Sequence, residues 1–153
     1  MTTETVTEKN ITFYPQQVIK GWLKQNFPHN PIYSTFPDLT AMRSPSDTEP
    51  FIVIPDSSLE QDRLQGKYAA YSGVIEGSIW HSRERLGDDK VRNIKQKLFY
   101  MFEKDEFTAR ELAHKGVRNV VIRFINTDGI PFERDSKALQ EFPFEIEFGL
   151  GVH

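Results

Sequence analysis

The stretch Phe142-Pro-Phe-Glu-Ile-Glu-Phe-Gly-Leu150, near the C-terminus, decides the fold. Every second residue from Phe142 to Leu150 is large and apolar, and Glu145 and Glu147 lie between them. A period of two predicts a β-strand with one buried aromatic face and one wet acidic face. Because this strand lies at the end of the chain, earlier segments must complete its core.

Length and composition indicate a globular protein. A chain of 153 residues suits one domain, and 38% hydrophobic with 27% charged residues is typical of soluble proteins. Twelve Phe, five Tyr and two Trp predict an aromatic-rich core or interface. We predict a single α/β domain over residues 13–153. Residues 1–12 are rich in Thr and Glu, and we expect them to form a flexible N-terminal arm.

Charge and cysteine content exclude several classes of site. The net charge of -3 gives no electrostatic argument for a nucleic-acid partner. The absence of Cys excludes disulfides, thiolate metal sites and cysteine nucleophiles. The first ten residues lack the pattern of a signal peptide, and no apolar run is long enough to span a bilayer. We therefore expect a soluble protein of the cytoplasm with no membrane partner.

Two main helices are predicted. Pro15 opens the first, which Pro28 stops. The second follows Asp88 and Asp89, which we expect to cap it. Its apolar stripe comprises Val91, Ile94, Leu98, Met101 and Phe102, and its basic residues Lys90, Arg92, Lys95, Lys97 and Lys104 are expected to face water. A short third helix is indicated by the capping-box spacing of Thr108 and Glu111 and by Gly116 at its end.

Several strands are predicted before the closing one. Residues 32–36 form a short strand, and residues 51–54 form a continuous apolar run typical of a central strand buried on both faces. Residues 67–81 predict a bent strand or a hairpin, with Gly73 and Gly77 at bulges or bends. Residues 117–126 form a further strand. Segments 37–50 and 56–66 are expected to be surface loops, and segment 130–141 a polar excursion.

These elements predict an α+β fold. A mainly antiparallel sheet of about four to five strands, with two main helices packed on one face, is the natural way to close the core.

The sequence offers no strong catalytic motif. No two of His29, His81, His114 and His153 share a metal-binding spacing with a carboxylate. No glycine-rich phosphate loop and no nucleophile elbow is present. We therefore predict no catalytic, cofactor-binding or metal-binding residues, no cofactor and no enzymatic activity.

Two sets of charged residues each allow an alternative interpretation. Glu145 and Glu147 are interpreted as the solvated face of the closing strand, and the alternative is metal-assisted chemistry, as in a small metal-dependent nuclease. The Lys/Arg face of the second main helix is interpreted as solvated, and the alternative is contact with phosphates.

The order of elements resembles a known family. A leading helix precedes an Ile-Tyr strand at Ile32, and Asp-x-x-Pro-Phe-Ile-Val-Ile follows from Asp47 to Ile54. A long strand precedes Asp-Asp-Lys-Val-Arg-Asn-Ile-Lys from Asp88 to Lys95, and the last strand contains Phe-Glu-Ile-Glu-Phe. Over residues 15–150 this arrangement resembles the tail-terminator, or tail-completion, proteins of long-tailed bacteriophages. Segments 56–66 and 103–116 depart from that pattern.

The resemblance implies a structural role. In that family a small α/β subunit forms a hexameric ring that caps the tail tube and joins the tail to the head. It implies self-association into a homohexamer ring, with the tail tube protein and head–tail connector or neck proteins as partners. The location would be the virion tail, assembled in the host cytoplasm. Residues 1–12, the 38–49 loop or the 130–141 segment are expected to carry these contacts. A connector or neck protein is the alternative virion role.

Overall fold

A computed structural model gives the structure of the chain and describes residues 14–38, 49–55, 70–134 and 137–151. The elements, in chain order, are α1 (Tyr14–Asn26), β1 (Ile32–Tyr33), β2 (Phe51–Val53), β3 (Ala70–Ser82), the 3-10 helix η2 (Arg83–Asp88), α2 (Lys90–Glu103), α3 (Glu106–His114), β4 (Val117–Phe124), β5 (Ile130–Arg134) and β6 (Lys137–Gly151). Three segments for which the sequence makes a prediction lie outside these ranges: the arm over residues 1–12, the loop 56–66 and nearly all of the loop 38–49.

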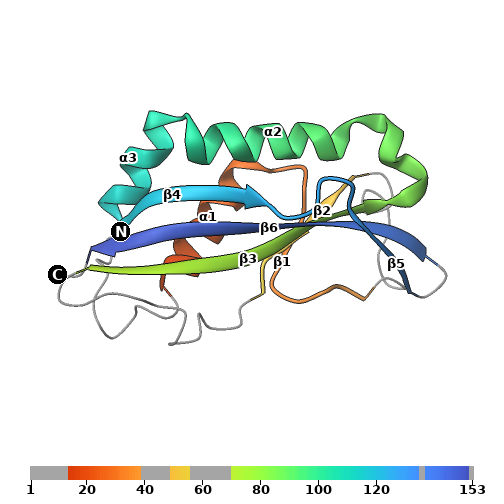
Figure 1. Cartoon of the computed structure of the whole chain (residues 1–153), viewed down its shortest axis with the longest axis horizontal. Coiled ribbons are helices and arrows are strands. Elements are labelled where there is room, and N and C mark those ends of the chain that lie inside the picture. The colour runs from red at the N-terminus through yellow and green to blue at the C-terminus, as the bar shows by residue number, and fades with distance from the viewer. Residues whose placement is uncertain (1–13, 39–48, 56–69, 135–136, 152–153) are drawn as a thin grey trace.

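Strand β6 organises the sheet, as the sequence predicts. It begins at Lys137, earlier than the expected start at Phe142, and both of its edges are paired. Strand β3 lies along one edge from Leu139 to Gly151, and β5 and then β4 lie along the other (Figure 1). The closing strand is therefore an interior strand of the sheet, between β3 on one side and β5 and β4 on the other.

The predicted fold class is confirmed. The sheet is antiparallel apart from the short β1–β2 pair, and over the described residues it has six strands rather than four or five. Strand β2 lies between β1 and β3 and is buried along its whole length, as a strand covered on both faces should be.

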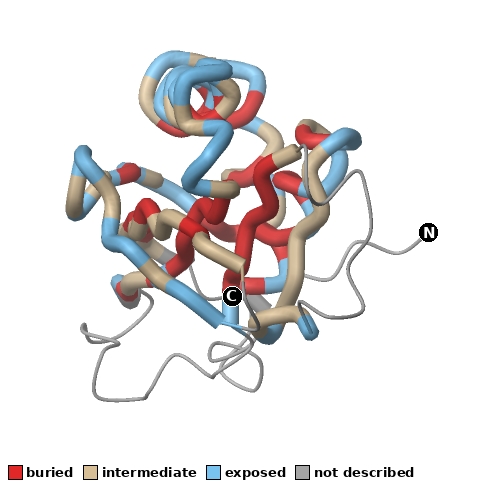
Figure 2. The backbone as a smooth tube through the Cα atoms, turned by 90° about the vertical axis from the view of Figure 1, so that its right-hand side faces the viewer, coloured by how far each residue is buried: buried red, intermediate tan, exposed pale blue. Residues whose placement is uncertain are grey.

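The main core lies between the sheet and the helices. Phe142, Phe144, Ile146 and Phe148 of β6 are all buried on the side that faces α1 and α2. Figure 2 looks along the strands and shows α2 as a layer above the buried central strands. The helices contribute the following buried residues to the same cluster: Val18, Ile19, Trp22, Leu23 and Phe27 from α1, Val91, Ile94, Leu98, Met101 and Phe102 from α2, and Leu112 from α3.

Strand β3 is a single strand, so the predicted hairpin is wrong. All thirteen of its residues pair with β6 in one unbroken register, and neither Gly73 nor Gly77 forms a bulge. Gly73 pairs with Phe148 and Gly77 pairs with Phe144. At Gly77 the ring of Phe144 occupies the space that a side chain would need. This glycine serves packing across the strands, and the chain does not turn there.

Strand β4 does contain a bulge. Its register with β6 shifts between Arg118 and Val121, where Asn119 has a positive φ of 53°. Val117 and Ile122 are separated by an odd number of positions and would face opposite sides of a regular strand. Both are buried, because the extra residue of the bulge brings them to the same face. Sequence alternation alone assigns Val120, Ile122 and Phe124 to the inner face, and their burial agrees with this.

Segment 130–141 is not an excursion. It consists of β5 and the beginning of β6, which form a hairpin in which Ile130 pairs with Glu141 and Arg134 with Lys137. Most of β5 is exposed on both faces, so its sequence shows no clear period of two. Pairing with β6, rather than burial, defines this strand.

The helix caps differ in detail from the expectation. The Asp88 carboxylate accepts the Lys90 backbone N–H at 3.0 Å, whereas Asp89 makes no capping bond and instead forms an ion pair with Arg92. Helix α3 begins at Glu106 and is capped by Asp105, so the capping box predicted at Thr108 is wrong. Gly116, with a φ of 87°, follows α3 as predicted.

Helices α2 and α3 both lie beside β4 (Figure 1). No described strand pairs with the outer side of β4, and the backbone N–H of Ile122 donates to the Glu103 carboxylate at 2.9 Å. A helix layer and a charged side chain therefore protect this edge of the sheet.

Candidate functional site

The face of the sheet opposite the helices is covered at one end. There Phe36 packs against Trp80, with ring centroids 4.8 Å apart, and against Phe51 and Phe132. The guanidinium of Arg134 lies 5.3 Å from the Phe36 ring centroid and completes the cluster. No described element covers the remainder of this face, over β3, β6 and β4, which we call the open face and take as the candidate site.

Glutamates of β6 dominate the open face. Glu145 lies opposite Glu76 of β3 on one side and opposite Arg123 of β4 on the other. The guanidinium of Arg123 reaches the Glu147 carboxylate at 3.2 Å. Both groups of this ion pair are substantially exposed, so the pair adds little to stability. The acidic face predicted from the alternation of β6 is present and partly neutralised.

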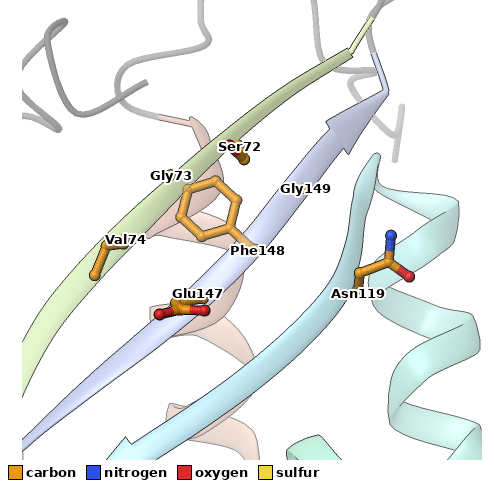
Figure 3. A pocket seen from close by; sticks show the side chains of 7 residues that line it. All are labelled: Ser72, Gly73, Val74, Asn119, Glu147, Phe148 and Gly149. Atoms are coloured by element: carbon orange, nitrogen blue, oxygen red, sulfur yellow. The ribbon is translucent and has the colours of Figure 1, made fainter. Parts of the chain in front are cut away.

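Two shallow hollows lie along the open face. The first, of about 360 Å³, is lined by residues of three neighbouring strands, including Val74, Asn119 and Glu147 (Figure 3). The second, of about 320 Å³, includes Ile125, Glu141 and Glu145. Small residues such as Ser72, Ser78 and Gly149 form much of their lining. These hollows make the open face uneven, and a partner surface of complementary shape can pack into them.

Glu141 of β6 is partly buried beside the second hollow. Burial raises the pKa of its carboxyl group, and a hydrogen bond with Ser78 opposes this effect only in part. The direction follows from the cost of placing a charge in a site of low polarity.

Glu145 and Glu147 are the only pair for which the sequence leaves metal-assisted chemistry open. They are on the same face of β6, but no third carboxylate or histidine joins them in an arrangement that could hold a metal ion, within the ranges that the structure describes. Arg123 instead pairs with Glu147.

The histidines lie apart from the open face or are exposed singly. His29 and His114 are exposed, and His153 lies outside the described residues. His81 is fully buried, and its Nε2 lies 3.0 Å from the Asp88 carboxylate. Its Nδ1 has no hydrogen-bond partner among the residues that the structure describes. Hydrogen bonds from the Lys90 backbone and from His81 overcome the opposing effect of burial and lower the pKa of Asp88.

The basic face of α2 is solvated in part: Arg92 and Lys97 are exposed, as predicted, and Lys90 is half-buried. Lys95 is half-buried, its Nζ lies 4.4 Å from the Phe142 ring centroid, and burial lowers its pKa. Lys97 donates to the Asn26 carbonyl and lies over the Phe27 ring, and Lys90 pairs with Glu49. Lys95 and Lys97 therefore lie over aromatic rings, and Lys90 is neutralised by a carboxylate.

Six large apolar side chains are exposed among the described residues, and none of them belongs to a motif that predicts a site from the sequence. Val121, Ile125 and Ile130 lie on the open face, since they are opposite Glu147, Pro143 and Glu141 of β6. Phe99, Tyr100 and Phe107 lie on α2 and α3. The alternation of β4 contains the signal for Val121 and Ile125, because their parity is opposite to that of the buried Ile122.

Comparison with protein-family models and with curated proteins gives no match. One solved structure is 13% identical in sequence and superposes with a TM-score of 0.41, covering 92% of this chain and 91% of its own. A likeness of this degree carries no argument about function. Within the described residues, no helix is both long enough and apolar enough to cross a membrane.

Proposed function

We propose that this chain is a structural protein of a long-tailed bacteriophage that forms a ring, caps the tail tube and joins the tail to the head. The ring is a homohexamer, and its partners are the tail tube protein and the connector or neck proteins. It is located in the virion tail after assembly in the host cytoplasm. In this proposal the chain has no catalytic role.

The observation that carries this proposal is the open face. A sheet that packs helices on one side leaves Val121, Ile125 and Ile130 exposed on the other, next to the glutamates of β6. Exposed apolar residues beside charged ones are typical of a surface that meets another protein. Support also comes from the succession of α1, β1, β2, long β3, α2 and a closing Phe-rich strand, which matches the element order of the tail-terminator resemblance.

An assembly experiment tests the role. Purified protein is added to phage tails that lack their terminator, together with filled heads, and the mixture is imaged by negative-stain electron microscopy. We expect rings of about six subunits at the head-proximal end of the tails, and tails joined to heads. Binding to heads but never to tails would instead indicate a connector or neck protein.

A separate assay tests the alternative function, a small metal-dependent nuclease. DNA is incubated with the protein and Mg²⁺, with Glu145→Gln as the matched variant that keeps the shape of the side chain. We expect no cleavage by either protein. Mg²⁺-dependent cleavage that is lost in Glu145→Gln would overturn the structural role.

A further inference from the structure

We infer that the open face binds a basic amphipathic helix of a partner protein, with a Lys or Arg side chain of that helix inserted in the second hollow. The inference rests on the proposed function, in which the open face meets another protein, and it names the chemistry of that partner.

The second hollow combines carboxyl groups with apolar walls. It has a volume of about 320 Å³, and its lining includes Glu76, Glu141 and Glu145. No Lys, Arg or His is among the described residues that line it. Ile125 and Pro143 contribute apolar surface beside the carboxyl groups. A long basic side chain matches this combination, because its stem is apolar and its end is charged.

Two of these glutamates face each other across the strands. Glu76 of β3 lies directly opposite Glu145 of β6, and like charges in this arrangement destabilise a sheet. Arg123, the neighbour of Glu145 on β4, instead reaches the Glu147 carboxylate at 3.2 Å. Burial raises the pKa of Glu141, and a cation placed in the hollow would oppose that effect. The hollow therefore favours a partner that brings positive charge.

Exposed aliphatic residues lie in and beside the second hollow. Ile125, which lines it, is 52% exposed. Ile130 lies opposite Glu141 and is 43% exposed, and Val121 is 40% exposed on the same face. The partner must therefore carry apolar side chains beside its basic ones, as an amphipathic helix does.

The face of a sheet favours a helix over an isolated extended segment. It presents side chains, whereas the backbone groups of β3, β6 and β4 bond within the sheet. Backbone N–H and C=O groups that the partner buries must therefore be paired within the partner, and a helix pairs them along its own length. The other face of this sheet packs α1 and α2 in the same way.

The described helices of a second copy do not have this chemistry. Helix α1 exposes a single basic residue, Lys24, and the four basic residues nearer the start of α2 already bond within their own chain. The surface where α2 ends and α3 begins is mostly acidic, with Glu103, Asp105, Glu106 and Glu111 against Lys104 and Arg110. The occupant is therefore a different protein.

Synthetic peptides test the inference on the full chain. The basic probe has about 20 residues, roughly 30 Å as a helix, with a Leu/Ile stripe flanked by Lys. The acidic probe has Glu in place of every Lys. The double variant Glu76→Gln/Glu145→Gln keeps the shape of the hollow, Ile125→Ser removes exposed apolar surface, and Glu106→Gln is the matched control on α3. Fluorescence anisotropy measures each affinity, and circular dichroism confirms that each variant is folded.

We expect the wild type and Glu106→Gln to bind the basic probe with equal affinity, and more weakly at high salt because the charges are screened. The double variant and Ile125→Ser should each bind it about tenfold more weakly or worse. None of the proteins should bind the acidic probe.

The inference is overturned if the wild type does not bind the basic probe at its highest soluble concentration, if the acidic probe binds as tightly, or if the double variant or Ile125→Ser binds as the wild type does. Sedimentation velocity without peptide adds a check on the occupant. Self-association of the wild type that Ile125→Ser abolishes would make the occupant a second copy and would also overturn the inference.

These results are separable from the proposed function. Tails that are still capped by a protein that fails to bind the basic probe would refute the site and leave the function standing. Specific binding of the basic probe by a protein that never caps tails would support the site and refute the function.

Discussion

Gly77 of β3 lies directly opposite Phe144 of β6, and a methyl group on Gly77 would come within 2.6 Å of the Phe144 Cζ. Phe144 is 1% exposed and belongs to the main core, so its ring has little room to move aside. The packing between β3 and β6 at this position therefore depends on the absence of a side chain at Gly77 and on the ring of Phe144.

Gly77→Ala should therefore destabilise the protein, by about 1–3 kcal/mol, because the added methyl group overpacks the core. The free energy of unfolding in urea measures the effect. Gly21→Ala is the matched control, since nothing lies within 4 Å of its added Cβ. In α1 this change should stabilise by about 0.5–1 kcal/mol. A Gly77→Ala variant as stable as the wild type would show that Phe144 repacks freely.

Phe144→Ala should cost about 3–5 kcal/mol, and Phe148→Ala a similar amount, because each removes a buried ring and leaves a cavity in the core. Chemical denaturation measures both. Phe99→Ala removes an exposed ring of the same type and should change stability by less than about 0.5 kcal/mol. If all three substitutions have equal effects, β6 does not organise the core.

Thr108→Val should destabilise the junction of α1 and α3. The buried Thr108 hydroxyl accepts the indole N–H of Trp22 at 3.2 Å and donates to the Asp105 carboxylate at 2.8 Å. Valine keeps the shape but leaves the indole N–H without its partner, at a cost of about 1–3 kcal/mol. Thermal unfolding followed by tryptophan fluorescence measures the loss. Thr127→Val, at an exposed position, should leave the transition unchanged.

Asp88→Asn should lose stability in a pH-dependent way. The pKa of Asp88 is lowered in the folded state, so its carboxylate contributes stability that is fully present above the unfolded pKa of about 3.9. That contribution disappears as the pH falls through the lower folded pKa. Urea unfolding at several pH values should show the wild type more stable than Asp88→Asn at neutral pH, with the difference shrinking in acid. A difference that does not change with pH would point to the shape of the side chain rather than to its charge.

Glu141→Gln should show the opposite sign. Burial raises the folded pKa of Glu141, so the ionised carboxylate costs stability above that pKa, and the cost is absent below the unfolded value of about 4.3. The variant should have a higher melting temperature than the wild type at neutral pH and the same melting temperature in acid. A lower melting temperature at neutral pH would contradict the raised pKa of Glu141.

Much of the fold can be predicted from local pattern. The alternation from Phe142 to Phe148, the apolar run at 51–54 and the helical stripe from Val91 to Phe102 each match a buried surface in the structure. Such patterns are visible because burial on one face repeats with the period of the element itself.

The sequence by itself determined which residues face the core, and with them the α+β class, because the hydrophobic effect acts on each residue according to its own polarity. Tertiary structure alone decided how the strands are arranged. Hydrogen-bonded pairing joins β5 to β6 although β5 buries little, and it makes β3 one continuous partner of β6 in spite of its glycines. The same holds for the open face, since only the packing of all three helices on one side leaves Val121, Ile125 and Ile130 exposed on the other.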